Sequence, residues 1–232
     1  MKTKSRIKMV LQAFALREAL VVIALLAVLA AMWLPAMRKA KVRSSRIGCA
    51  NNLKHINLAF TQWSLDNTDR YPTQVSVTNG GTMELLRQGD VFTTFLVMSN
   101  ELNTPKVLIC PGETDGRRLA ATTFGNRPGP HQIPFTNNNN VSYFIGVDAE
   151  DLKPQMLLVG DSHFAIGGRR VPPGLLRLET NSAVSWPRPI RARHEKGGNI
   201  GLADGSVMNC DDRGFREMLS QSGDLTNRLA IP

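Results

Sequence analysis

The residues of this chain that are best suited to chemistry are carboxylates and imidazoles in its last third. Both groups are ligands for divalent metals, and both serve as general acids and bases. The set consists of Asp161, His163, His194, Asp204, Asp211 and Asp212. None of them lies in an H-E-x-x-H or paired C-x-x-C spacing, so the chain carries no zinc motif. Asp161, His194 and Asp204 are therefore the candidates for a metal or catalytic site.

The Asp204-Gly205 dipeptide also has a purely structural interpretation. It stands between the strand-like runs NIGLA and SVMNC, and Asp-Gly favours a two-residue hairpin turn with positive φ. His194 would then hydrogen-bond a loop carbonyl. We favour this interpretation over a hydrolase based on His194 and Asp204, because Asp-Gly is a strong turn signal by itself. No P-loop, G-x-G-x-x-G or G-x-S-x-G pattern occurs, so we expect no enzyme.

The net charge of +9 is confined to the amino-terminal quarter. Residues 1–54 hold eleven lysines and arginines against one acid, whereas residues 55–232 hold seventeen against eighteen acids. A neutral body lacks the basic surface that nucleic-acid binding requires, so we expect no strong nucleic-acid binding. A hydrophobic content of 42% and a charged content of 20% exclude a multi-span membrane protein and a disordered chain.

Residues 19–37, ALVVIALLAVLAAMWLPAM, form an uncharged run. As a helix the run is about 28 Å long, which is enough to cross a bilayer core. One interpretation is a cleaved secretory signal with small residues near Ala30 and Ala31, and another is a plain signal anchor. Neither explains Arg17 and Glu18, which directly precede the run. A carboxylate at the edge of a span indicates a function and needs a partner, which a free amino terminus nearby would supply.

The segment FALREALVVIALLAVLAAMWLP resembles the amino terminus of type IV pilins and type II secretion pseudopilins. The resemblance implies that residues 1–13 are a leader, which prepilin peptidase removes between Ala13 and Phe14. Ala13 stands where the family usually has glycine. The resemblance also implies that Phe14 is N-methylated and that Glu18 pairs with the amino terminus of a neighbouring subunit during assembly. Pro35 stands where the family often has a proline.

The string RHEKGGNIGLADGSV resembles the H-x9-DG element of a large group of bacterial pilin-like proteins, with His194, Asp204 and Gly205 as its fixed residues. Companion features are CANNLKHINLAFTQWSLDNTDRYP, a Cys-Pro pair at Cys110, VSYFIGVD and LLVGDSHF, so the resemblance covers nearly the whole chain. Major pseudopilins hold calcium in a carboxyl-terminal loop. The chain has no matching run of alternating acids, so we expect no cofactor and keep calcium as an alternative.

The chain has three cysteines, Cys49, Cys110 and Cys210, and disulfides can form between them if the body faces the periplasm. The resemblance implies a disulfide between Cys49 on the helix and Cys110 of the Cys-Pro pair. The alternatives are a Cys110–Cys210 disulfide and three buried free thiols.

The periodicity of residues 49–63 predicts that the helix continues beyond the apolar run to about Asp66. Cys49, Leu53, Ile56, Phe60 and Trp63 form one apolar stripe, which indicates a helix face packed on a sheet. The remaining patterns predict helices at 82–89, 91–102 and 212–221, and strands at 106–110, 141–147, 156–160, 175–179, 198–203 and over SVMNC.

Together these features predict an α+β, pilin-like fold, in which a long N-terminal helix, transmembrane in its first half, packs on a small antiparallel sheet domain. The expected order is a leader (1–13), a transmembrane assembly helix (14–37), its amphipathic continuation (38–66) and a periplasmic domain (67–232) with the H-x9-DG hairpin at 194–205. The expected localisation is the bacterial inner membrane, single-pass, with the N-terminus cytoplasmic, and on assembly an extracytoplasmic filament.

The expected function is that of a structural subunit of a type IV pilus-like or type II secretion pseudopilus filament, and thus a role in protein transport. The implied partners are homologous subunits, prepilin peptidase, an inner-membrane assembly platform and membrane lipid. The alternative is a membrane-anchored periplasmic or surface module that recognises a glycan or a secreted protein through the 125–140 loop and the hairpin. In that case the pilin-like segment serves for targeting only.

Overall fold

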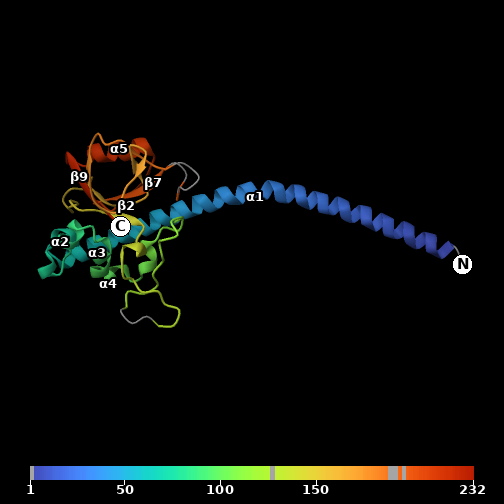
Figure 1. Cartoon of the computed structure of the whole chain (residues 1–232), viewed down its shortest axis with the longest axis horizontal. Helices are drawn as coiled ribbons and strands as arrows, with labels where there is room; N and C mark the ends of the chain where they lie inside the picture. Colours follow the sequence, from blue (N-terminus) through green and yellow to red (C-terminus); the bar gives the residue numbers. More distant parts are fainter. Residues whose placement is uncertain (1–2, 126–128, 188–192, 195–196) are drawn as a thin grey trace. The chain divides into compact units, whose positions relative to one another are not determined.

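Helix α1, Thr3–Asp66, is the longest element of the chain (Figure 1). The computed structural model describes residues 3–125, 129–187, 193–194 and 197–232, with residues 3–15, 35 and 38 described by their backbone only. The predicted end of the helix at Asp66 is confirmed. It ends there because Thr68 and Asp69 adopt positive φ angles of 56° and 55°, a conformation that stops an α-helix.

The chain divides into two compact units, Met1–Arg43 and Ser44–Pro232. In the first unit, the described large hydrophobic side chains from Leu16 to Met37 are 54–72% exposed. An 18-residue window of this helix has a mean hydropathy of 2.6, and none of it is buried. By length and composition this apolar helix near the N-terminus is able to span a membrane.

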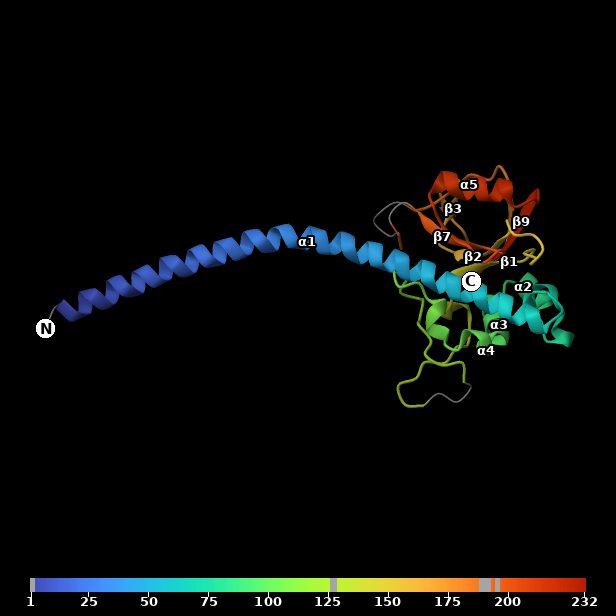
Figure 2. The same ribbon diagram turned by 180° about the vertical axis from the view of Figure 1, so that it is seen from behind.

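The second unit is built on an antiparallel sheet with the strand order β5-β9-β1-β2-β7-β8 (Figures 1 and 2). The α+β class is thus confirmed. The strands of this sheet are β1 (Tyr143–Gly146), β2 (Leu157–Asp161), β5 (Gly174–Glu179), β7 (Gly198–Leu202), β8 (Val207–Cys210) and β9 (Thr226–Ile231). A smaller sheet in the order β4-β3-β6 contains β3 (Ala165–Ile166), β4 (Arg169–Arg170) and β6 (Val184–Ser185).

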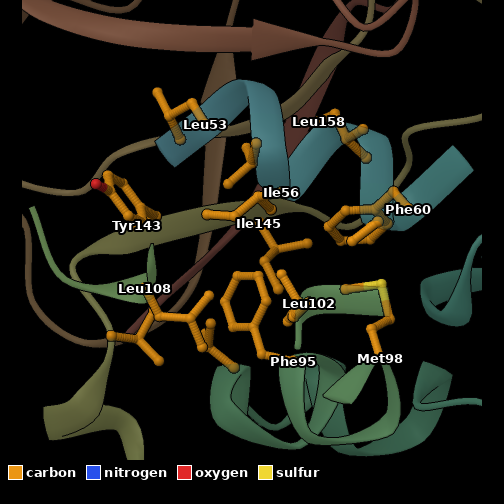
Figure 3. Close-up of a cluster of buried hydrophobic side chains, with 14 of the residues drawn as sticks. Leu53, Ile56, Phe60, Phe95, Met98, Leu102, Leu108, Tyr143, Ile145 and Leu158 are labelled. Atoms are coloured by element: carbon orange, nitrogen blue, oxygen red, sulfur yellow. The ribbon is translucent and has the colours of Figure 1, made fainter. Parts of the chain in front are cut away.

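The two faces of the large sheet bury different apolar clusters. Along β1, Tyr143 and Ile145 join the cluster of the α1 stripe, whereas Phe144 joins the cluster of α5 (Asp212–Gln221). The first cluster also includes side chains of α2 (Met83–Arg87), α3 (Val91–Val97) and α4 (Ser99–Leu102). Figure 3 shows Leu53, Ile56 and Phe60 of the stripe together with Phe95 of α3 and Leu102 of α4. The stripe is confirmed, because four of its five side chains are fully buried and Trp63 is 6% exposed.

In the part of the chain that the structure describes, four short 3-10 helices lie among these elements: η1 (Pro72–Gln74), η2 (Val77–Asn79), η3 (Pro105–Leu108) and η4 (Asn138–Asn140). The strand predicted at 106–110 is wrong, because most of it forms η3. Pro105 occupies the first turn of η3, and the Thr104 side chain accepts a hydrogen bond from the Lys106 amide. Both features favour a helical turn over an extended chain.

The hairpin between β7 and β8 forms at Asp204-Gly205, but its turn has three residues instead of the predicted two. The Gly205 amide donates to the Leu202 carbonyl (3.0 Å), and the Leu202 amide donates to the Ser206 carbonyl (2.9 Å). Within the turn only Gly205 has positive φ, +82°. The Asp204 carboxylate accepts a hydrogen bond from the Ser206 amide (2.8 Å), which stabilises this wider loop.

Gly198 on β7 is expected to tolerate no larger residue. A Cβ at this position would lie 2.2 Å from the Trp186 ring, which is 3% exposed and stacked on Phe215. We expect Gly198→Ala to lower the free energy of unfolding by about 1–3 kcal/mol, because the core has no space for the methyl group. Urea unfolding measures the effect. Gly116→Ala is the control, since a Cβ there meets no atom within 4 Å; equal effects of the two variants would contradict the packing argument.

Candidate functional site

Four side chains from separate parts of the second unit meet in a buried polar cluster. They are Cys49 of α1, Cys110 after η3, Asp161 at the end of β2 and His194 before β7, and their ligand atoms all lie within 4.8 Å of one another. The Cys49 thiol donates to Asp161 Oδ1 at 3.3 Å. His194 Nε2 lies 3.3 Å from Cys110 Sγ and 3.4 Å from Asp161 Oδ2. None of the four residues is more than 1% exposed.

Backbone geometry explains why the Cys110-Pro111-Gly112 turn lies against His194. The Gly112 amide donates to Cys110 Sγ at 3.4 Å and so closes a tight turn around the sulfur. A Cβ on Gly112 would lie 2.7 Å from the carbonyl oxygen of Arg193, which is closer than real Cβ contacts. Glycine is therefore required for the turn to approach the chain at Arg193 and His194.

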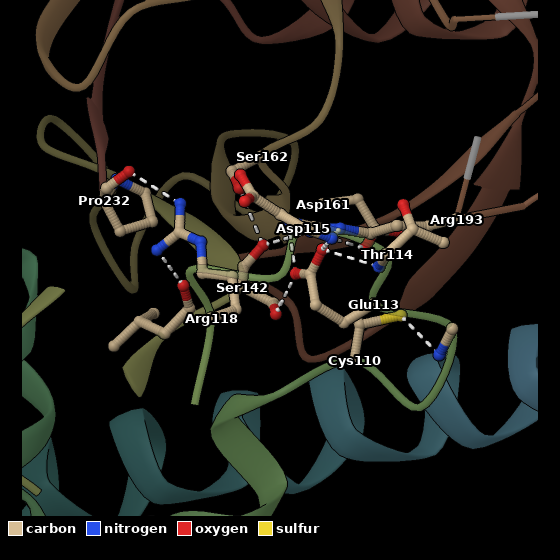
Figure 4. A network of polar contacts seen from close by, with 12 residues as sticks. Cys110, Glu113, Thr114, Asp115, Arg118, Ser142, Asp161, Ser162, Arg193 and Pro232 are labelled. Carbon is tan, nitrogen blue, oxygen red and sulfur yellow. Dashed lines mark hydrogen bonds and ion pairs between the residues drawn. The ribbon is translucent and has the colours of Figure 1, made fainter. Parts of the chain in front are cut away.

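Arg193 extends the cluster through a buried ion pair with Glu113 (Figure 4). Its Nη2 lies 2.6 Å from Glu113 Oε2, and its Nη1 donates to the Ser142 carbonyl at 2.6 Å. Nη1 also lies 3.9 Å from Asp161 Oδ1. The guanidinium thus places a permanent positive charge beside two buried carboxylates, which compensates their desolvation.

The surroundings keep Asp161 and His194 ionised and the Cys49 thiol protonated. Burial raises the pKa of Asp161, but the hydrogen bond from His194 and the nearby positive charges outweigh burial and hold this pKa well below its usual range. Burial lowers the pKa of His194, whereas the contacts with Asp161 and Cys49 raise it to about 9 overall. Burial, followed by the contact with Cys110, raises the pKa of the Cys49 thiol well above its ordinary value.

A cavity of about 840 Å³ adjoins the cluster and is lined by Glu113, His163, Trp186 and Arg193 among others. His163 is 4% exposed, and burial lowers its pKa to about 3, so its ring is neutral. Neither of its ring nitrogens has a hydrogen-bond partner among the residues that the structure describes. The ring lies 5.9 Å from that of His194, centroid to centroid.

The structure brings two of the three metal candidates together and separates the third. Asp161 and His194 are in contact, whereas Asp204 is exposed in the hairpin turn. His194 contacts a carboxylate and a thiol. The predicted hydrogen bond from His194 to a loop carbonyl is therefore wrong. Asp211 caps α5 by accepting from the Arg213 and Gly214 amides, and Asp212 accepts from the Trp186 amide.

All three cysteines are buried free thiols. The Cys49–Cys110 disulfide implied by the resemblance is therefore not formed in the structure, although the two sulfur atoms lie within 4.8 Å of each other. The Cys110–Cys210 disulfide is not formed either. Cys49, Cys110 and Arg193 were not predicted as neighbours of Asp161, and Glu113 was not predicted as the partner of Arg193. Three features of the sequence mark these residues: Cys49 is the first residue of the helix stripe, Cys110 begins the Cys-Pro-Gly run, and Arg193 directly precedes His194.

The residues predicted for processing and assembly belong to the first unit. Ala13, Phe14 and Pro35 lie in α1, and their side chains are outside the part of the chain that the structure describes. Glu18 is described and exposed. It immediately precedes the exposed apolar side chains.

Comparisons with protein-family models, with curated proteins and with solved structures give no match for this chain.

Proposed function

We propose that this chain is a pilin-like structural subunit, anchored in a membrane by α1 and polymerising through it. The observation that carries the proposal is the exposed apolar stretch of α1 that follows Glu18. Its large hydrophobic residues occupy consecutive positions, including Leu20, Val21, Val22 and Ile23, so they surround the helix on every side. A helix that is apolar on all sides requires lipid or other apolar helices around it.

Glu18 supports polymerisation over simple anchoring. A carboxylate at the edge of a membrane span is unfavourable unless a positive group pairs with it. The amino terminus of a neighbouring subunit, freed by removal of the leader before Phe14, would supply that group and set the register between subunits. The same interaction is what the resemblance to pilins and pseudopilins implies.

The proposal includes the route and the partners. Prepilin peptidase removes residues 1–13, the membrane is the bacterial inner membrane, and the Ser44–Pro232 unit lies in the periplasm. Like subunits and an inner-membrane assembly platform build a pseudopilus-type filament. The alternative is a membrane-anchored binding module that uses the apolar helix for targeting only.

Substitution of Glu18 distinguishes these two functions. We expect Glu18→Ala to reduce cross-linked oligomers of the full-length protein in membranes at least about tenfold. Loss of one partner of a buried charge pair weakens a contact by about 2–5 kcal/mol, and each 1.4 kcal/mol is a factor of ten. Glu18→Asp is the matched control, because it keeps the charge. Unchanged oligomers in Glu18→Ala would overturn assembly through Glu18 and favour the anchored module.

The amino terminus of the protein extracted from native membranes tests the processing step separately. We expect an intact mass and a terminal sequence that begin at N-methylated Phe14. A chain that begins near Ala31 would indicate an ordinary secretory signal, and a chain that keeps Met1 would indicate an uncleaved anchor.

A further inference from the structure

We propose that Cys49, Cys110, Asp161 and His194 form a tetrahedral zinc site that fastens the buried end of α1 to the sheet domain. The inference concerns the Ser44–Pro232 unit alone and does not depend on filament assembly. Its basis is the convergence of four ligand atoms, each from a different part of the fold, at one buried point.

The spacing of the four atoms fits a single tetrahedral ion. Bonds of about 2.3 Å to sulfur and about 2.0–2.1 Å to nitrogen or oxygen place neighbouring ligand atoms about 3.3–3.8 Å apart. The Cys49–Asp161 and Cys110–His194 contacts are both 3.3 Å, and the His194–Asp161 contact is 3.4 Å. The remaining separations are below 4.8 Å. Small side-chain shifts therefore suffice to close the shell.

The chemistry of the donors selects zinc over calcium or magnesium. Two sulfurs, one imidazole nitrogen and one carboxylate oxygen make a borderline-soft set, which zinc accepts in closed structural sites. Calcium and magnesium take oxygen ligands almost exclusively and in larger numbers. His194 presents Nε2 to Asp161 and Cys110, so zinc bound at Nε2 replaces the proton there and leaves the other ring proton on Nδ1.

The groups around the four residues are those that support metal ligands. The Gly112 amide donates to Cys110 Sγ, and the Asn199 amide donates to Asp161 Oδ2 at 2.8 Å. Hydrogen bonds of this kind orient ligands and tune the metal. Two thiolates and a carboxylate exceed the charge of Zn²⁺ by one, and the guanidinium of Arg193 lies beside Asp161.

A zinc ion would connect residues that are far apart in the chain. Cys49 and His194 are separated by 145 positions, and no such site exists in the unfolded chain. Zinc binding is thereby coupled to folding, and removal of the metal weakens the connection between α1 and β2. A Cys49–Cys110 disulfide would make a similar connection but would exclude zinc, because the metal needs both thiolates.

The test uses full-length protein purified in detergent under reducing conditions and without chelator. We expect about one zinc per chain by elemental analysis. After removal of the metal, added Co²⁺ should produce thiolate-to-cobalt charge-transfer absorption and the visible bands of tetrahedral cobalt. Both readouts use the wild-type chain, so they do not depend on whether a variant folds.

Variants then assign the ligands. Loss of an outer-shell partner weakens metal binding by about 10–100-fold, and loss of a direct ligand should cost at least the upper end of that range. We therefore expect Cys49→Ser and Cys110→Ser each to weaken zinc binding at least about a hundredfold. Cys210→Ser is the matched control, because Cys210 is a buried free thiol outside the cluster. Added zinc should raise the thermal unfolding midpoint of the wild type and of Cys210→Ser only.

Three outcomes would overturn the zinc site. The first is a reduced wild-type chain that takes up neither zinc nor cobalt. The second is zinc binding that Cys49→Ser and Cys110→Ser leave unchanged while circular dichroism shows folded protein. The third is protein from native membranes in which mass analysis without reductant finds Cys49 disulfide-bonded to Cys110.

Discussion

Arg193→Met is expected to lower the free energy of unfolding of the Ser44–Pro232 unit by about 3–5 kcal/mol. The Arg193 side chain is 1% exposed and lies 2.6 Å from Glu113. Methionine keeps a similar length but removes the charge. The buried carboxylates of Glu113 and Asp161 then lose a positive neighbour, and the Ser142 carbonyl loses a donor. Uncompensated buried charge is among the most destabilising changes that a folded protein can undergo.

Urea unfolding of the full-length protein in detergent, followed by near-ultraviolet circular dichroism, measures this loss. Arg117→Met is the matched control, because Arg117 pairs with Asp115 while 76% of its side chain is exposed. We expect that control to change stability by less than about 1 kcal/mol. Adding Glu113→Gln to Arg193→Met should recover part of the loss, because it removes one unpaired carboxylate. A loss no larger than that of Arg117→Met would show that the ion pair is unimportant for stability.

Phe60→Ala is expected to lower the free energy of unfolding by about 3–5 kcal/mol. Phe60 is fully buried in the α1 stripe, and its ring meets Tyr71 and Phe95 edge-on at centroid distances of 5.5 and 6.5 Å. Alanine leaves a cavity between α1 and α3 and removes both aromatic contacts. The substitution therefore weakens the packing of α1 on the domain.

Leu58→Ala is the control for this second variant, because Leu58 lies on the same helix and is 54% exposed. We expect it to change stability by less than about 0.5 kcal/mol. The same urea titration applies to both variants. If Phe60→Ala and Leu58→Ala had similar effects, the stripe would not be the contact that holds the helix to the domain.

Local patterns predicted those elements whose formation depends on residues close together in the chain. The stripe from Cys49 to Trp63 repeats with the period of a helix, and all five of its residues are buried. The closing helix predicted at 212–221 is α5, Asp212–Gln221, because Asp211 caps it and Phe215, Met218 and Leu219 form its buried face. β1, β7 and β8 also fall within predicted segments, and β2 and β5 each extend one residue beyond theirs, to Asp161 and to Gly174.

The misses depend on contacts that local patterns do not contain. Strand β9, Thr226–Ile231, was not predicted, although it lies between β5 and β1 in the sheet. Even its nearest partner in the chain is distant, because Glu179 precedes the paired Thr226 by 47 positions. The two-residue strands β3, β4 and β6 are too short to show any alternation. At 106–110 the turn at Pro105 prevailed over the apolar run.

The sequence by itself determined the apolar helix with Glu18 at its edge, the buried stripe, the hairpin position and the α+β class, because each depends on the types and spacing of residues close together in the chain. Only the tertiary structure decided the candidate site. More than 50 positions separate Cys49 from Cys110 and Cys110 from Asp161, and 33 positions separate Asp161 from His194. Pairing of β2 with β7 and packing of α1 beneath them bring the four side chains together. Antiparallel pairing and burial act between residues this far apart in the chain. The spacing of the four residues in the sequence therefore does not predict that they meet.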